Sequence, residues 1–311
     1  MKFSSITSRF SALLAAGAIL LSAAAGVQAQ QLQVATGKPG DTYSTMLKQL
    51  SARCGTSVAL IENASGGSED NINSLVGNQV NAAFVQSDVL WLRARTEDLG
   101  NVKTLLALHP EQVHLVANVD SGMKSGGVMG IGGSKVVLED ITQLGGLRVG
   151  AAGGSKVTAQ VVRMQTEIPF HVMPFDSGAD VLAALAKGEI QAALFVGGAP
   201  LASLAKLGPD YKLLSIPAPV VEKLKGVYRP AKLNYSKMGS TGITTVATDA
   251  LFVTREYKTP KMVDGLAKLR NCAIESIDEL KETTGTHPAW SHVDPANKGK
   301  WPYYDLPVAK K

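Results

Sequence analysis

The chain has 311 residues, and its 31 lysines and arginines exceed its 26 aspartates and glutamates by a net charge of +5. Hydrophobic residues make up 45% of the sequence, and the length is enough for one large domain or two modest ones with a substantial core. A weak basic excess without basic clusters argues against nucleic acid as a partner and is compatible with small anionic ligands.

The N-terminus has the pattern of a secretory signal peptide. Lys2 and Arg9 precede the apolar, small-residue-rich run Ser11–Val27, and a small-x-small cleavage site ends at Ala29. The pattern predicts cleavage of residues 1–29 and a periplasmic mature chain, with an uncleaved membrane anchor as the alternative. Removal of the two basic residues lowers the net charge from +5 to +3.

Strand and helix patterns alternate through the mature chain, which predicts an α/β fold with mainly parallel sheets flanked by helices. Ser68 is expected to cap its helix, with Glu69 and Asp70 in the first turn. The first predicted elements are a strand at Leu32–Thr36, a helix at Thr42–Arg53, a strand at Ser57–Ile61, a helix from Ser68 to Gly77 and a strand at Val80–Val85.

Two segments of the first half recur in the second half in the same order. Val80–Phe84 aligns with Ile190–Leu194 at an offset of 110 residues, and Val34–Ser44 resembles Val149–Ala159. Val34–Ser44 and its later copy each lead from a strand through a glycine loop into a helix. Val80–Phe84 and its later copy are each a buried strand that follows a helix. The repeat predicts two lobes of similar topology.

Two extended segments are expected to cross between these lobes, Val113–Asn118 on the way out and Thr244–Thr254 on the way back. This assigns residues 30–117 and 247–311 to lobe I and residues 118–246 to lobe II, with hinges near Asn118 and Thr244. The expected fold is therefore a hinged clamshell of two α/β lobes. The glycine-rich stretch Ser121–Lys135 is expected to form a mobile loop or hairpin inserted in lobe II.

The two cysteines, Cys54 and Cys272, are too few for a disulfide scaffold. In an exported chain they could form a disulfide if the fold brings them together, and two buried free thiols are the alternative.

Patterns of catalysis are weak. Ser121 and Lys124 have the S-x-x-K spacing but lie in a glycine-rich loop, and no matching SDN or KTG element accompanies them. The five histidines show no metal-ligand spacing, and Gly130–Lys135 is neither a P-loop nor a dinucleotide fingerprint. We therefore expect no enzyme activity, no cofactor and no metal. A secreted serine hydrolase using Ser121 or Ser155 is the remaining enzymatic alternative.

Three glycine loops each follow a strand and open a helix, at Thr36–Tyr43, Ser65–Asp70 and Ala151–Thr158. In open α/β sheets such loops line the ligand crevice, and helix N-termini bind anions through free backbone N–H groups. The predicted ligand-binding residues on these loops and nearby strand ends are Thr36, Gly37, Lys38, Thr42, Tyr43, Ser65, Gly67, Ser68, Gln86, Ser87, Gly154, Ser155, Lys156, Phe195 and Gly197.

At these loops the sequence resembles the TAXI family, the extracytoplasmic solute receptors of one class of TRAP transporter. The matching pieces are TGKPGDTYSTM, SGGSEDNINSLVGNQVNAAFVQSDV, VHLVANVDSGMKS, LGGLRVGAAGGSKVTAQ and VLAALAKGEIQAALFVGGAPL. The resemblance implies that the clamshell is a type II fold of the periplasmic-binding-protein kind. It also implies a small carboxylate ligand, an amino or oxo acid, and transient docking to an ion-coupled membrane permease. A sensory or ligand-capture protein without a transporter is the alternative.

Overall fold

The structure, a computed structural model, describes residues 30–125 and 134–307. The predicted signal peptide, residues 1–29, lies outside the described residues, and so does the centre of the predicted insertion, residues 126–133. Within the described ranges, none of the helices combines the length and the apolar character needed to cross a membrane.

Lobe I begins with a βαβαβ unit in which β1 pairs in parallel with both β2 and β3. The alternation predicted from the sequence is confirmed here, but the chain then enters a short helix, α3, where the sequence suggested only a strand end. The elements are β1 (Gln30–Ala35), α1 (Thr42–Cys54), β2 (Val58–Asn63), α2 (Ser68–Val76), β3 (Ala82–Gln86) and α3 (Ser87–Arg93).

Lobe II repeats this arrangement, since β7 pairs in parallel with both β8 and β9. Val34 pairs with Ala82 in lobe I, and Val149 pairs with Ala192 in lobe II. The pairing confirms the repeat of the two segments, since each pair joins the residues that the sequence comparison aligned between the two lobes. The elements are β7 (Arg148–Ala152), α4 (Ser155–Thr166), β8 (His171–Phe175), α5 (Gly178–Ala186), β9 (Ala192–Gly197), β10 (Tyr211–Leu213), α6 (Ala218–Leu224) and β11 (Arg229–Tyr235).

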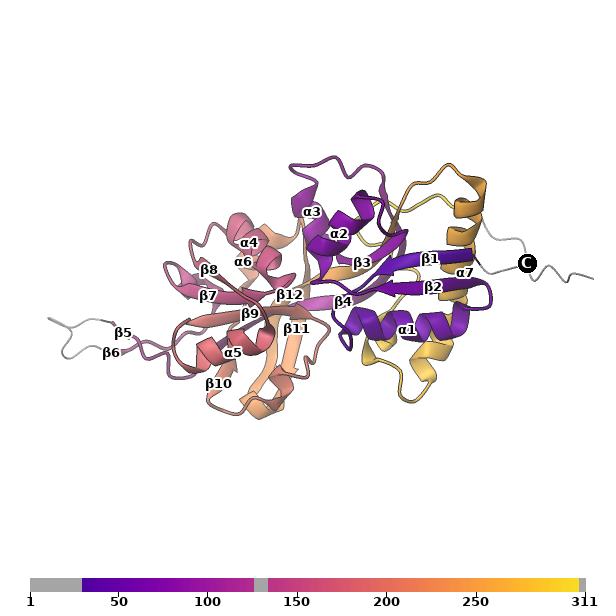
Figure 1. Ribbon diagram of the computed structural model, residues 1–311. Helices are drawn as coiled ribbons and strands as arrows, with labels where there is room; N and C mark the ends of the chain where they lie inside the picture. The colour runs from indigo at the N-terminus through magenta and orange to yellow at the C-terminus, as the bar shows by residue number, and fades with distance from the viewer. Residues whose placement is uncertain (1–29, 126–133, 308–311) are drawn as a thin grey trace, which may run out of the picture.

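Two long antiparallel strands, β4 (Val102–Asn118) and β12 (Ser240–Arg255), run through both lobes. They join the lobes into one ten-stranded sheet with the central order β2-β1-β3-β12-β4-β9-β7-β8, and Figure 1 shows them between the two groups of helices. The sequence suggested a separate sheet in each lobe. The pairing is continuous because β12 pairs with both β3 and β4, and β4 pairs with both β12 and β9.

The strand pairing differs from the predicted position of the first hinge, which stays a prediction. Asn118 lies at the far end of β4 within lobe II, where it pairs with Tyr211 of β10. Strand β4 changes partners earlier, because it pairs with β12 up to Gln112 and with β9 from Gln112 onward. The strand pairing therefore puts the first crossing near Pro110–Gln112. The polar stretch His109–Gln112, which contains Pro110, interrupts the apolar pattern at this place and was the available signal in the sequence.

The second crossing lies close to its expected place. Thr244 still pairs with Lys232 of β11, and β12 meets β4 from Ala247 onward. The division of the chain into lobes at residues 117/118 and 246/247 remains a prediction, for which the pairing favours an earlier first boundary.

The C-terminal helix α7 (Pro260–Glu282) covers lobe I, as expected, and packs on α1. Cys54, the last residue of α1, forms a disulfide with Cys272 of α7, with 5.8 Å between the two Cα atoms. A cluster of buried hydrophobic residues extends from lobe I into lobe II, and α3 packs on α4. The lobes are thus joined by packing as well as by the two strands.

Short elements complete the fold. The described ends of the predicted insertion, Lys124–Ser125 and Ser134–Lys135, project from lobe II in Figure 1 and pair with each other in antiparallel. The remaining elements are β5 (Lys124–Ser125), β6 (Ser134–Lys135) and the 3-10 helices η1 (Ile141–Leu144), η2 (Leu204–Lys206), η3 (Ser236–Met238) and η4 (Pro288–His292).

Candidate functional site

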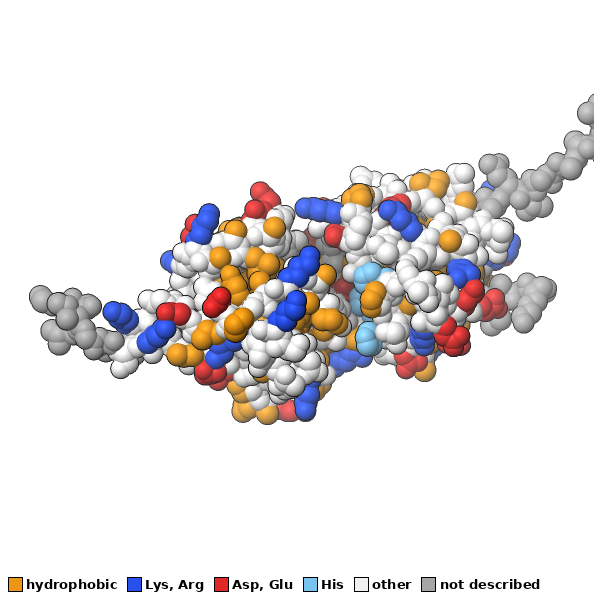
Figure 2. Space-filling model, turned by 90° about the horizontal axis from the view of Figure 1, so that it is seen from below, with side chains coloured by type: hydrophobic (Ala, Val, Ile, Leu, Met, Phe, Trp, Pro, Cys, Tyr) orange, Lys and Arg blue, Asp and Glu red, His pale blue; other side chains and the backbone are white. Residues whose placement is uncertain are grey.

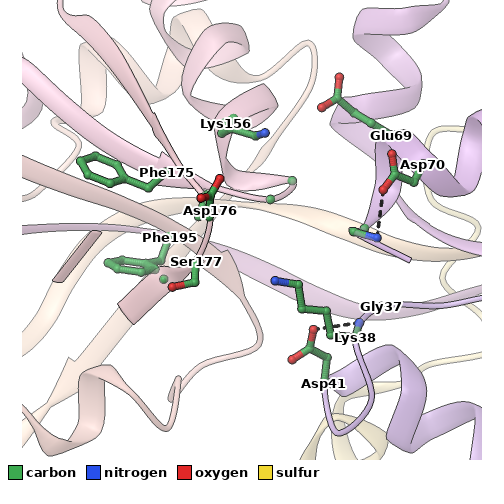
Figure 3. Close-up of a pocket in the computed structure, with 16 residues that line it drawn as sticks. Gly37, Lys38, Asp41, Glu69, Asp70, Lys156, Phe175, Asp176, Ser177 and Phe195 are labelled. Atoms are coloured by element: carbon green, nitrogen blue, oxygen red, sulfur yellow. Dashed lines mark hydrogen bonds between the residues drawn. The ribbon is translucent and has the colours of Figure 1, made fainter. Parts of the chain in front are cut away.

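The N-termini of four helices bound a cleft between the lobes. Helices α1 and α2 follow β1 and β2 on lobe I, and α4 and α5 follow β7 and β8 on lobe II. Because these strands are parallel within each lobe, their C-terminal loops open toward the same space. The surface is hollowed between the lobes in Figure 2. Figure 3 shows Lys38 and Glu69 of lobe I facing Lys156 and Asp176 of lobe II.

The cleft has two adjoining compartments that share the glycine loops of both lobes. The wide compartment, of about 470 Å³, is lined by Gly37, Lys38, Asp41, Gly66, Gly67, Glu69, Asp70, Ala152, Gly153, Gly154, Lys156, Phe175, Asp176, Ser177, Gly178 and Phe195. The narrow compartment, of about 280 Å³, is lined by Gly37, Asp41, Thr42, Tyr43, Gly66, Gly67, Ser68, Gln86, Glu111, Ala152, Gly153, Gly154, Ser155, Val196, Gly197 and Leu201.

Most of the residues predicted to hold a ligand come together in this cleft, although they are spread over 161 positions of the chain from Gly37 to Gly197. Those that line one or both compartments are Gly37, Lys38, Thr42, Tyr43, Gly67, Ser68, Gln86, Gly154, Ser155, Lys156, Phe195 and Gly197. Their contact with a ligand remains a prediction.

Thr36 and Ser65 line neither compartment, because their hydroxyls serve the loops themselves. Thr36 is fully buried, and its hydroxyl donates to Glu62 at 2.9 Å. The Ser65 hydroxyl donates to the Thr36 carbonyl oxygen at 2.9 Å and also lies 2.6 Å from Asn71 Oδ1. These bonds tie the loop before α2 to the end of β1.

Ser87 is also absent from the cleft lining. Its hydroxyl shares a hydrogen bond with Thr248 Oγ1 at 2.8 Å and accepts from the Asp249 backbone N–H at 3.2 Å. The first helical residue of α3 therefore fastens this helix to the crossing strand β12, and Ser87 is a structural residue in this arrangement.

The loop before α2 differs from its prediction in one detail. Gly67, with φ of 120°, is the N-cap, and Ser68 is the first helical residue. The Ser68 hydroxyl accepts a hydrogen bond from the Gln86 backbone N–H at 3.0 Å, which joins α2 to the end of β3.

Gln86 also reaches the loop of the opposite lobe. A Cβ atom added to Gly154 would lie 2.0 Å from Gln86 Oε1, and one added to Gly67 would lie 3.8 Å from the Gly154 nitrogen. The glycine loops of the two lobes therefore meet in a closed arrangement, in which a side chain at position 154 would displace the end of the Gln86 side chain.

Backbone N–H groups at the starts of α2 and α4 are free to bind a ligand. Across the described ranges, the N–H groups of Ser68, Glu69 and Ser155 make no hydrogen bond to a protein acceptor. Such groups carry the positive end of the helix dipole and bind anions. Since Ser68 and Ser155 both line the narrow compartment, two helix N-termini from opposite lobes converge there.

The wide compartment carries charges of both signs. The predicted cations Lys38 and Lys156 line it, together with four carboxylates that the sequence analysis did not assign to the site: Asp41, Glu69, Asp70 and Asp176. Two of these hold their own loops, because Asp41 accepts from the Lys38 N–H at 3.1 Å and Asp70 accepts from the Gly66 N–H at 2.9 Å (Figure 3). The positions of Asp41 and Asp70 within the predicted glycine loops were the sequence feature that could have assigned them to the site.

The narrow compartment ends at a buried carboxylate, Glu111, on the crossing strand β4. The Tyr43 hydroxyl donates to Glu111 Oε2 at 3.1 Å. Burial, reinforced by the neighbouring Glu111 charge, raises the pKa of the Tyr43 phenol well above its ordinary value, so this hydroxyl remains a donor. No motif marks Glu111, which the sequence analysis missed because it lies within a long strand.

A second buried carboxylate joins the lobes behind the cleft. Asp88 on α3 is fully buried and accepts hydrogen bonds from Thr158 Oγ1 of α4 at 2.6 Å and from the Tyr228 hydroxyl at 2.9 Å. Burial raises the pKa of the Asp88 carboxyl, while these hydrogen bonds act in the opposite direction. The contact joins lobe I directly to two elements of lobe II.

The serines of the hydrolase alternative have structural partners. Ser121 lies outside both compartments, where its hydroxyl donates to the Val136 carbonyl oxygen and accepts from the Met123 N–H. The Ser155 hydroxyl accepts from the Val196 N–H at 3.0 Å. No histidine or lysine side chain bonds either hydroxyl within the described part of the chain, which also holds no group of three or more histidine, cysteine or acidic residues suited to a metal ion.

Comparisons with known proteins support the fold. The profile of the NMT1-like family matches residues 34–297. A solved structure of a Bordetella bronchiseptica RB50 protein is similar at a TM-score of 0.51 and 14% identity, covering 86% of this chain and 79% of that one. The GluR0 ligand-binding core of Nostoc punctiforme in complex with L-glutamate matches at 0.48 and 12%, covering 80% and 93%. The expected type II periplasmic-binding-protein fold is confirmed.

Proposed function

Because the chain belongs to the NMT1-like family, we propose that it is a periplasmic solute receptor that closes its lobes on a small carboxylate. The observation that carries this proposal is the convergence of two free helix N-termini, at Ser68 and Ser155, in one compartment between the lobes. Backbone N–H groups held in place by the fold bind a carboxylate without a counter-charge from a side chain.

In this proposal the carboxylate gains its affinity from closure of the two lobes. The two N-termini belong to different lobes, so a carboxylate can bridge them only when the lobes are together. A ligand that binds the closed state more tightly shifts the population toward it. The crossings near Pro110–Gln112 and Ala247 are the places where the chain would bend.

The proposed type of transporter follows from the resemblance of the loop segments to TAXI receptors. We propose that the closed protein docks transiently on an ion-coupled permease of the TRAP type, and that residues 1–29 direct its export. The protein acts as a receptor without chemical conversion of the solute.

Titration calorimetry and thermal shift against a panel of small carboxylates test the proposal. The variant Gly154→Ala is expected to weaken carboxylate binding at least about tenfold, because its methyl group displaces Gln86 from the closed contact. Gly226→Ala is the matched control, since nothing lies within 4 Å of a Cβ atom there. Binding that is unaffected by Gly154→Ala, or the absence of any carboxylate that raises the melting temperature, would contradict the proposal.

A further inference from the structure

Glu111 differs from the four other carboxylates that line the cleft, because it is buried, whereas Asp41, Glu69, Asp70 and Asp176 are exposed. Its side chain is 8% exposed and lies where β4 crosses between the lobes, opposite Thr248 of β12. It lines the narrow compartment together with the free helix N-termini of α2 and α4. One small space thus holds a positive pole made of backbone N–H groups and a negative pole made of a carboxylate.

The protein itself offers little compensation for this carboxylate. Its hydrogen bond from the Tyr43 hydroxyl reaches only Oε2. His109 Nε2 lies 3.5 Å from Oε1 but makes no hydrogen bond with it. Within the described ranges no lysine or arginine forms an ion pair with Glu111, and the two lysines of the cleft line the wide compartment only.

Buried carboxylates are unfavourable unless they are paired, and a binding site can leave the pairing to its ligand. An ammonium group supplies the charge and the hydrogen-bond donors that Glu111 lacks. A second carboxylate of a ligand would instead meet a like charge in a space of low dielectric constant.

From this arrangement we infer that the solute carries a protonated nitrogen beside its carboxylate, and that Glu111 binds this nitrogen. The inference rests on the proposed function, because the same solute's carboxylate occupies the N-termini of α2 and α4. It selects amino acids over the corresponding oxo acids. The wide compartment, with Phe175, Phe195 and charges of both signs, is then left for the remainder of the solute.

Matched pairs of probes test the inference by titration calorimetry: L-alanine with pyruvate, L-leucine with 4-methyl-2-oxopentanoate, and L-glutamate with 2-oxoglutarate. At least one amino acid is expected to bind more tightly than its oxo acid by about tenfold or more, because the oxo acid brings no ammonium group to the buried Glu111. Glu111→Gln should remove most of this preference by weakening the amino acid. Glu275→Gln, at an exposed position of α7, should leave it unchanged.

The outcomes separate this inference from the proposed function. Binding of oxo acids in preference to amino acids would overturn the inference and leave the carboxylate receptor standing. Binding of no member of any pair would contradict both. An undiminished preference in folded Glu111→Gln would also overturn the inference. If that variant does not fold, Glu111→Asp replaces it, and retention of the amino-acid preference with a lower affinity is the result expected.

Discussion

The two lobes share a topology and differ in how they are stabilised. In each lobe a central parallel strand, β1 or β7, lies between two parallel neighbours, and helices begin at the same edge. Lobe I has a disulfide between α1 and α7. Within the described residues lobe II has no disulfide, and its core contains a buried histidine, His114.

The cleft surfaces of the lobes differ as well. Lobe I contributes three of the four loop carboxylates, namely Asp41, Glu69 and Asp70, and the ring of Tyr43. Lobe II contributes Asp176 and the rings of Phe175 and Phe195. The comparison teaches that the repeated unit provides only the backbone of the site, namely paired helix N-termini. The side chains that distinguish one ligand from another come from positions at which the two copies are unlike.

Removal of the disulfide should produce the largest effect and should destabilise lobe I. The bond closes a loop with a sequence separation of 218 residues, and loss of such a bond costs about 2–5 kcal/mol of unfolding free energy through the entropy of the unfolded chain. Urea unfolding of Cys54→Ala/Cys272→Ala measures it. The reduced wild-type protein is the control and should match the double variant. A loss below about 1 kcal/mol would show that packing alone holds α7 in place.

The next largest effect concerns His114 in lobe II and depends on pH. Burial, only partly opposed by the Gln112 and Phe195 backbone, lowers the pKa of this imidazole from 6.5 to about 4. The unfolded chain therefore takes up a proton below about pH 6.5 and the folded chain does not until about pH 4. Stability is full above pH 6.5 and falls as the pH decreases toward 4, by about 3 kcal/mol in total.

The variant His114→Phe keeps an aromatic ring against Tyr235, which His114 contacts edge-on at 5.6 Å between ring centroids. Its unfolding free energy should lose this acid-dependent decrease between pH 6.5 and 4. His292→Gln, an exposed position, serves as the control and should retain the wild-type dependence. An unchanged pH profile in His114→Phe would mean that other groups cause the acid sensitivity.

Much of the fold was predictable because its signals are local. Apolar runs bounded by glycine loops gave the strands of both lobes, and similarity between the segments ending at Phe84 and Leu194 gave the repeat. The first crossing was not predictable in the same way. Strand β4 continues from lobe I into lobe II past the polar stretch His109–Gln112, and its pairing partners reveal that the change of lobe lies there.

The sequence predicted which loops line the cleft better than it predicted which side chains of those loops face it. Position at a strand end indicated which loops face the space, but not the direction of each hydroxyl. The Thr36 hydroxyl bonds to Glu62 and the Ser87 hydroxyl bonds to Thr248, so both hydroxyls stabilise the fold and do not line the cleft. Glu111 and Asp88 were missed for the opposite reason, since long-range packing rather than local pattern makes a buried carboxylate noticeable.

The smallest expected effect on the unfolding free energy concerns the side-chain cap at a helix N-terminus, at which the two lobes differ. Helix α5 of lobe II has a side-chain cap, because the Ser177 hydroxyl accepts from the Asp180 N–H at 3.2 Å, whereas α2 of lobe I begins at Gly67 without one. Ser177→Ala should lower the unfolding free energy by about 1 kcal/mol. The matched control is Ser203→Ala, because Ser203 caps η2 without a side-chain hydrogen bond. Equal urea midpoints for the two variants would mean that the cap of α5 adds nothing to the stability of lobe II, and that the lobes differ at the cleft only in their exposed side chains.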